Sequence, residues 1–391
     1  MERTGRLAMT GFLATAVTYG PARMGFGLFL PEFRDAFSLS STDAGLIASA
    51  SFAAFVAAVL LAGAMIARLG PRAPVLTACA LAGTGMGLVA AAGTPAMLAA
   101  GVVLAGASPG LSWSPFNDAG NRLVTTEQQP WVLSSVSTGT TVGVALAGAL
   151  ALAASFSGLG WRAVWAIFAL AGVAAALAAA RGLRGVGSVA PPSRPTHGLR
   201  DLLTDALAPI CFVALSHGAV SSIYISFAAD WVTRSGEMEA LSQSQAGAVI
   251  FICYGLCGMA GLATGALERQ LGLVPLLRVV FLCLTLSLAL LALLPGNAPA
   301  VLISAGLQGA CVMIVSAVLA VWSLRLFPAL PSLGFTAALL ALAAGSALGP
   351  AAAGLAMDML GTPPALLATA ALSLATAAAL SVLSFRARPS D

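Results

Sequence analysis

Long apolar runs separated by short polar turns occupy almost the whole chain, and they restrict what it can fold into. Hydrophobic residues make up 59% of the sequence and charged residues only 8%, whereas a soluble domain carries roughly 25% charged residues. A soluble protein of this composition would have too little polar surface to cover its exterior. The chain therefore needs the hydrocarbon of a lipid bilayer as its solvent, where such runs form α-helices.

Turn signals divide the apolar sequence into twelve stretches, each near the ~20 residues that a membrane-spanning helix requires. The first six are approximately 7–30, 44–66, 73–92, 95–123, 131–154 and 161–180, and the second six are 206–229, 243–267, 273–294, 299–323, 332–356 and 363–384. The predicted fold class is all-α, a polytopic membrane protein with twelve transmembrane helices.

The longest polar interruption runs from Arg181 to Asp205, and its prolines and glycines indicate an irregular linker. We expect an N-terminal six-helix bundle over residues 1–182, a cytoplasmic linker over 183–203 and a C-terminal six-helix bundle over 204–391. The linker can act as a hinge or only as a tether, because composition sets no more than its stiffness and reach.

The arginines predict the orientation in the membrane. If the N-terminus is cytoplasmic, the outer segments hold only Arg34, Arg162 and Arg234. The positive-inside rule then places both termini in the cytoplasm, and we expect a multi-pass protein of the inner membrane. The first apolar run is longer than the core of a signal peptide, so we expect it to be retained as a span.

Several classes of function find no support in the sequence. The sequence has no basic patch with interleaved aromatic residues, so nothing in it indicates a nucleic-acid partner. The six cysteines lie inside apolar runs, where buried thiols are expected, so we predict no metal site and no cofactor. The sequence has no HExxH motif and no paired acidic motif within the spans, so no motif indicates an enzyme. An intramembrane enzyme and a receptor that binds without transporting nevertheless stay open as alternatives.

Two glycine patterns occur once in each half of the chain. The pattern at 63–70 recurs at 265–272, and the glycines spaced through the fifth span at 139–148 recur in the eleventh at 345–354. The two offsets, 202 and 206 residues, are nearly equal and close to half the chain. This agreement indicates a duplicated six-helix unit and hence two pseudo-symmetric bundles.

With this repeat, the whole chain resembles the twelve-helix transporters of the major facilitator superfamily. The loop after the second span is similar to the family pattern G-x-L-x-D-R-x-G-R-R and matches it at Gly63, Arg68, Gly70 and Arg72, with Ala67 at the acidic position. The resemblance implies that this loop locks one conformation through charge pairs.

The eleventh span, GSALGPAAAG, resembles a second family pattern, G-x-x-x-G-P-x-x-x-G, through Gly349 and Pro350. Exporters of the family typically carry this pattern in the fifth span, where this chain has Val144 in place of the proline. Glycines four residues apart let helix backbones approach closely, and Pro350 can bend its helix. Packing and gating are both open readings of the pattern.

Polar and ionisable groups inside the spans are costly and therefore indicate function. Arg23 lies in the first span roughly 10 Å below its outer end, too deep to reach the interface easily, and its planar fork suits an anionic group. A structural pair with an acid on another helix is the alternative.

The fourth span holds the densest polar set. Trp113 and Asn117 are predicted to contact substrate, and Asp118 is predicted to carry a proton, because burial would raise its pKa. The alternative for Asp118 is an ion pair with Arg122 one turn away.

In the seventh span, His217 could titrate near neutral pH, and Tyr224 shares its helix face. Gln308, near the middle of the tenth span, could bind substrate. Each could instead make only helix-to-helix hydrogen bonds. The resemblance implies that the first, fourth, seventh and tenth spans line a central cavity, and the candidate residues fall on these four spans.

These observations predict a secondary transporter that moves a small organic anion, such as a carboxylate, by alternating access. No nucleotide-binding loop is present, and protons are the expected coupling ion, carried by Asp118 or His217. We expect a monomer whose partners are the solute, protons and the lipid bilayer. The alternative is an exporter of amphipathic compounds.

Overall fold

Helices form almost all of the structure, a computed structural model that describes residues 2–184, 207–235, 243–326 and 331–382. No strand occurs within these ranges. This confirms the predicted all-α membrane fold. Most of the predicted linker over residues 183–203 lies outside the described residues.

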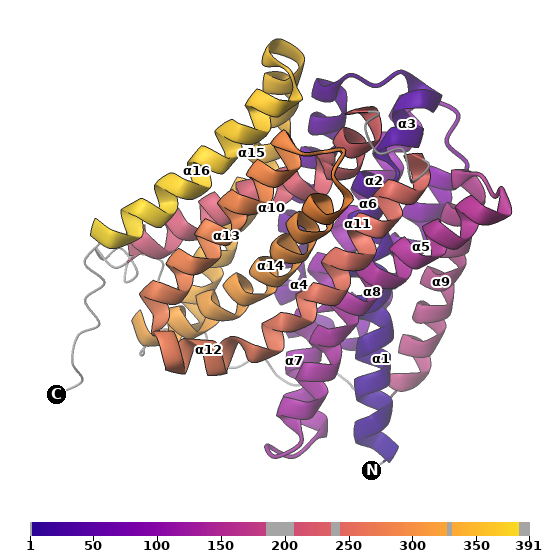
Figure 1. The fold of residues 1–391 in the computed structure, drawn as a ribbon. Helices are drawn as coiled ribbons and strands as arrows, with labels where there is room; N and C mark the ends of the chain where they lie inside the picture. The colour runs from indigo at the N-terminus through magenta and orange to yellow at the C-terminus, as the bar shows by residue number, and fades with distance from the viewer. Residues whose placement is uncertain (1, 185–206, 236–242, 327–330, 383–391) are drawn as a thin grey trace.

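The first half of the chain forms nine helices in the described ranges. They are α1 (Glu2–Tyr19), α2 (Pro21–Leu28), α3 (Leu30–Phe37), α4 (Ser41–Leu69), α5 (Arg72–Ala90), α6 (Pro95–Ser112), α7 (Ser114–Leu123), α8 (Gln129–Ser157) and α9 (Trp161–Gly182) (Figure 1). The N-terminus of α1 and the helix α7 lie at one end of the molecule, called here the N-terminal face. The helix α3 lies at the opposite end, called here the α3 face.

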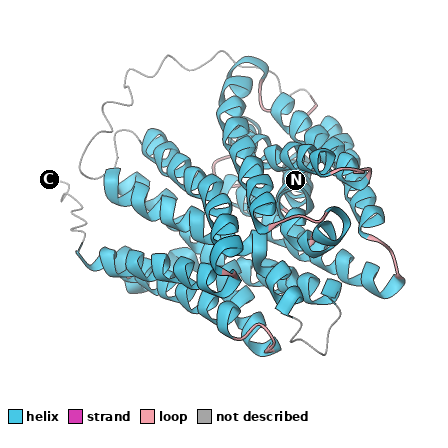
Figure 2. Ribbon diagram, turned by 90° about the horizontal axis from the view of Figure 1, so that it is seen from above, coloured by secondary structure: helices cyan, strands magenta, loops and turns pink. Residues whose placement is uncertain are grey.

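The second half forms seven α-helices and one short 3₁₀ segment (Met259–Ala263) in the described ranges. The helices are α10 (Leu207–Ser235), α11 (Gln243–Gly258), α12 (Thr264–Leu271), α13 (Leu273–Leu293), α14 (Ala298–Leu326), α15 (Pro331–Leu360) and α16 (Thr362–Val382). Figure 2 shows the molecule from above, with helices joined by short loops throughout the described residues.

Eleven stretches of the described residues are long and apolar enough to cross a membrane. The expected first span, residues 7–30, is not among them, because Gly20 and Pro21 divide it between α1 and α2. Proline has no backbone N–H and clashes with the preceding helical turn, so it starts a new helix there. The fourth span is divided in the same way at Trp113, just before Pro115.

The two halves meet through three sets of helices: α4 against α15, α8 against α11, and α2 and α3 against α10. Small residues make these contacts close. A Cβ on Gly45 would clash with the carbonyl of Pro350, and one on Gly354 would clash with the carbonyl of Ser41. In a membrane, helices associate through such close backbone packing rather than through the hydrophobic effect. The α4–α15 contact therefore holds the halves together near the α3 face.

Aromatic side chains fix α2 and α3 against α9. Phe33 lies edge-on to Trp161 at 5.1 Å between ring centroids, and Phe29 lies edge-on to Trp165 at 6.1 Å. Each such pair stabilises packing by about 0.5–1.5 kcal/mol beyond its burial. This cluster gives α3 a fixed position from which its polar side chains reach the second half.

Candidate functional site

Arg23 occupies an aromatic enclosure on α2. Its guanidinium carbon lies 4.2 Å from the ring centroid of Phe55, 5.1 Å from that of Phe52 and 5.8 Å from that of Tyr19. The structure shows no carboxylate within ion-pairing distance of it in the described ranges. Its Nη1 is buried without a hydrogen-bond partner among the described residues. The geometry agrees with an unpaired cation stabilised by aromatic faces.

A narrow cavity of about 10 Å³ lies beside Arg23 and is bounded by both halves of the chain. Its first-half walls include Ser51 and Phe52 of α4, and its second-half walls are Ile225 and Ser226 of α10. A cavity of this size holds about one water molecule. An organic anion would fit beside Arg23 only after the halves move apart.

Other buried polar groups also lack hydrogen-bond partners among the described residues, and they include the hydroxyl of Tyr254 on α11 and the side-chain amide of Gln308 on α14. Gly309, next to Gln308, packs directly against the backbone carbonyl of Tyr254, so the two groups come from touching helices. Tyr254 also lies within electrostatic reach of Arg23. Unpaired buried polar groups are rare in native structures and point to a ligand or to function.

Tyr254 was absent from the residues predicted from the sequence. The chain has only three tyrosines, and each lies within an apolar run. This scarcity is a usable signal, because a phenol inside a membrane span must find a partner for its hydroxyl.

The structure places His217 and Tyr224 inside the second half. His217 lies 3.3–3.4 Å from the hydroxyl of Ser221, and its ring is edge-on to Phe281 of α13. The hydroxyl of Tyr224 accepts a hydrogen bond from Ser304 of α14 at 3.1 Å. The bond between Ser304 and Tyr224 joins two helices, whereas Ser221 lies on the same helix as His217. Roles for His217, Tyr224 and Gln308 in binding substrate, and for His217 in carrying a proton, stay predictions.

The polar residues of the fourth span lie near the N-terminal face. Asp118 forms an ion pair with Arg122 on the same helix, through contacts of 2.8 and 2.9 Å. Trp113 marks the break between α6 and α7 and packs on a core cluster of the first half. Asn117, one turn further on, is half-buried. Substrate contact by Trp113 and Asn117 stays a prediction.

The predicted gating residues fall into two groups. Arg68 is exposed in the last turn of α4, while Arg72 donates a hydrogen bond to the carbonyl of Ala180 at 3.3 Å. Gly63 has open space around it, and Gly70 ends α4 with φ +76°, a backbone conformation that favours glycine.

Gly349 and Pro350 form the second group. A Cβ on Gly349 would lie 3.0 Å from the backbone of Ala219 on α10. Pro350 lies inside the continuous helix α15, and its carbonyl contacts Gly45 of the first half. A gating role for these six residues stays a prediction.

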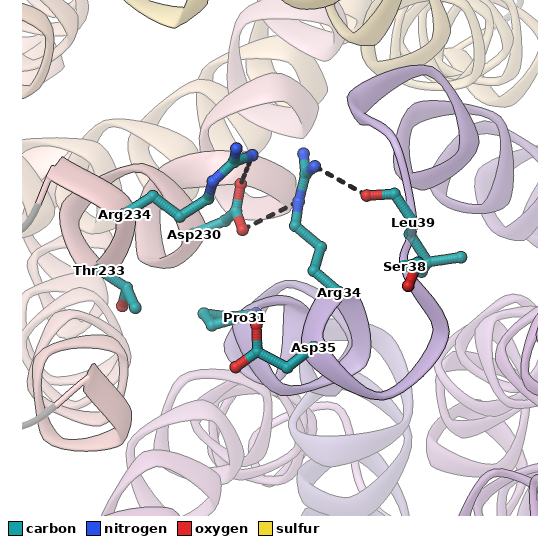
Figure 3. A pocket seen from close by; sticks show the side chains of 8 residues that line it. All are labelled: Pro31, Arg34, Asp35, Ser38, Leu39, Asp230, Thr233 and Arg234. Carbon is teal, nitrogen blue, oxygen red and sulfur yellow. Dashed lines mark hydrogen bonds and ion pairs between the residues drawn. The ribbon is translucent and has the colours of Figure 1, made fainter.

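At the α3 face, charged groups join the two halves directly. Arg34 on α3 forms an ion pair of 2.9 Å with Asp230 on α10, and Arg234 lies 4.0 Å from the same carboxylate. Figure 3 shows both guanidinium groups converging on Asp230, while Asp35 points away. Arg34 also donates hydrogen bonds to the carbonyl of Leu39 and the hydroxyl of Ser41, each at 3.0 Å.

A second connection lies beside the first. The carboxylate of Asp358 on α15 accepts hydrogen bonds from the backbone N–H groups of Ser41 at 3.0 Å and Thr42 at 2.8 Å. These are the first residues of α4, where the helix dipole favours a negative charge. We call Arg34, Asp230, Arg234 and Asp358, with the start of α4, the α3-face latch.

The latch borders a cavity of about 330 Å³ lined by Pro31, Arg34, Asp35, Ser38, Leu39, Asp230, Thr233 and Arg234. Burial lowers the pKa of Arg34 from its usual value, and the charge of Asp230 opposes that effect. The guanidinium is therefore partly desolvated and depends on its acidic partner. The arrangement holds the halves together at the α3 face.

Comparison with known proteins places the fold. The family model described as the Major Facilitator Superfamily matches residues 11–328. No curated protein matches the chain by sequence.

Three solved structures with this fold illustrate the likeness. A variant of the nucleoside transporter NupG has a TM-score of 0.78 at 13% identity and covers 98% of this chain and 100% of its own. A bacterial homologue of the human lysosomal transporter Spinster, solved inward-facing and unoccupied, has a TM-score of 0.78 at 16% identity and covers 99% of both chains. A variant of the peptide transporter POT has a TM-score of 0.79 at 13% identity and covers 97% of this chain and 94% of its own.

Proposed function

The chain belongs to the Major Facilitator Superfamily, and from this premise we propose that it is a secondary active transporter of a small organic anion, driven by protons. By family and fold it is a membrane transporter. Its two halves would move relative to each other, so that a site between them opens to one side of the membrane at a time.

The observation that carries the anion proposal is the unpaired state of Arg23. A guanidinium held among Phe52, Phe55 and Tyr19, with a buried N–H that has no partner in the described ranges, is ready to bind an anionic oxygen. Tyr254 and Gln308 would add neutral hydrogen bonds from the second half. The anion would bind most tightly when side chains from both halves contact it at the same time.

The structure has the halves tied at the α3 face, which supports a conformation closed on that side. We propose that the α3 face is the outer side of the inner membrane and that both termini are cytoplasmic, as the positive-inside rule predicts. The carrier would act as a monomer, because each chain has both halves of the site.

Proteoliposomes that contain a trapped pH dye test this proposal with a panel of organic anions. We expect one anion to move together with protons in the native protein, and Arg23→Ala to abolish this flux. Arg184→Ala, which removes an exposed arginine at the N-terminal side, should leave it unchanged. Anion transport that persists in Arg23→Ala would refute Arg23 as the anion site.

The second candidate, an exporter of amphipathic compounds, is favoured by the aromatic rings around Arg23. It predicts that expression confers resistance to such compounds and that Arg23→Ala does not change the resistance. The two functions therefore give opposite results in the same variant.

A further inference from the structure

Glu32 is a half-buried glutamate that contributes to neither the anion site nor the α3-face latch. It lies on α3, beyond the predicted end of the first membrane span at residue 30. Its Oε2 is buried and has no hydrogen-bond partner among the described residues. Removing water from a carboxylate oxygen without supplying a partner disfavours the ionised form, so such a group binds a proton more readily.

The helix that carries Glu32 packs against both halves of the chain. The helix α3 packs against α10 and α11 of the second half as well as against α2. Its neighbour Arg34 is paired with Asp230, and Leu28, four residues before Glu32, lies close to Gly247 at the start of α11. Opening the α3 face would separate α3 from α10 and α11 and bring water to Glu32.

Several charged and titratable groups lie on the elements around α3. In the described ranges they are Arg34 and Asp35 on α3, Arg23 on α2, Arg162 and Arg181 on α9, Cys211, His217, Tyr224, Asp230 and Arg234 on α10, and Cys253, Tyr254 and Cys257 on α11. Burial is the largest cause that raises the pKa of Glu32, to about 7; its own backbone N–H lowers the pKa, and the negative charge of Asp35 raises it further.

We propose that Glu32 is the residue that binds the coupling proton, holding it while the α3 face is closed and releasing it to the solvent on that side when the face opens. On release, the O–H bond of the neutral carboxyl group breaks, the electron pair stays on the carboxylate, and the proton passes to water. This proposal rests on the proposed function of proton-coupled transport. It replaces Asp118, which Arg122 already neutralises, and His217, which is enclosed in the second half.

The direction of coupling follows from the pKa difference. The pKa is raised in the closed state, so protonation favours closure at low pH, and this preference is lost as the pH rises through about 7. With about 7 in the closed state and the ordinary value of 4.5 in the open state, the closed-to-open ratio falls about tenfold between pH 6 and pH 8.

Infrared difference spectroscopy of the purified full chain during a pH titration detects this proton directly. We expect a carbonyl band of a protonated carboxylic acid to disappear with a midpoint near the pKa of Glu32 and this component to be missing in Glu32→Gln, while a component from Asp230, whose pKa burial raises to about 6, remains. Glu127→Gln, which changes an exposed glutamate, is the matched control and should keep the band. A band that persists unchanged in Glu32→Gln overturns the proposal.

Transport separates this inference from the proposed function. In proteoliposomes, Glu32→Gln should still exchange anion for anion but should lose accumulation driven by a pH gradient, and Glu32→Asp, which restores a titratable acid, should recover it. If Glu32→Gln still moves protons with the anion, Glu32 is not the proton site. If the native protein moves no anion while the infrared band titrates as expected, the proposed function fails and proton binding by Glu32 stands.

Discussion

Replacing Asp230 by asparagine tests whether the α3-face latch sets the balance between closed and open states. Asparagine keeps the shape and one acceptor oxygen but removes the charge that pairs with Arg34. Both side chains are buried, at 7% and 10% exposure. Breaking a buried ion pair from one side costs about 3–5 kcal/mol, because the remaining charge is left without compensation.

The expected effect is smaller than that range. Arg34 keeps two acceptors, the carbonyl of Leu39 and the hydroxyl of Ser41, and the contact with Asp230 lacks the alignment of a hydrogen bond although it spans only 2.9 Å. We therefore expect the closed state to lose about 2 kcal/mol, which raises the open population about 30-fold. Asp358→Asn acts on an exposed carboxylate and should lose about 1 kcal/mol, or about fivefold.

Hydrogen–deuterium exchange measures this shift directly, because amides protected only by closure exchange in proportion to the open population. The segments to follow are residues 38–45 and 354–361, which lie on opposite sides of the contact. Glu268→Gln breaks the 2.8 Å ion pair between Glu268 and Arg325 within the second half, and it should leave exchange at the α3 face unchanged. Exchange that stays the same in Asp230→Asn would show that backbone packing, not charge, holds this face closed.

Three further changes give separate predictions. Gly45→Val places a side chain against the carbonyl of Pro350, so it should prevent closure, raise hydrogen–deuterium exchange at the α3 face and abolish flux. Normal flux in this variant would contradict the observed packing. Tyr254→Phe removes a hydroxyl without a partner in the described ranges; thermal unfolding should change by less than about 0.5 kcal/mol, whereas anion affinity, measured by calorimetry, should fall about fivefold if the hydroxyl binds the anion. Asp118→Asn breaks the pair with Arg122 and should lower stability by about 0.3–0.5 kcal/mol while proton-coupled flux continues; loss of coupling would return Asp118 to the role of proton carrier.

Most of the fold follows from local sequence. Apolar length and turn residues identify the membrane helices, since a span must satisfy its backbone hydrogen bonds within itself. The glycine pattern of the eleventh span falls where α15 touches its neighbours: Gly349 packs on α10, and Gly354 packs on α4. The division of the first span was missed although Gly20 and Pro21 signal a break, because the apolar run continues on both sides of them.

The site could be predicted only in part. Arg23 could be identified as a candidate from the sequence, because a charged side chain deep in a span is costly whichever residues surround it. Arg34 and Asp230 are almost 200 positions apart in the sequence. The residue pattern within one helix does not indicate which distant residue a side chain will contact. Glu32 looked like an ordinary outer-loop acid, because nothing in the local sequence indicates that one of its carboxylate oxygens is buried.

The contact of Asp358 with the start of α4 has a consequence for how this protein tolerates change. Its donors are main-chain amides, which every amino acid except proline supplies, so side-chain variation at positions 41 and 42 leaves both hydrogen bonds possible. The first amides of any helix lack partners within that helix, so when the halves separate they can turn to water and α4 itself loses no internal bond. This connection between the halves therefore requires one specific residue, Asp358, on one side. On the other side it requires only that a helix begin at the same place.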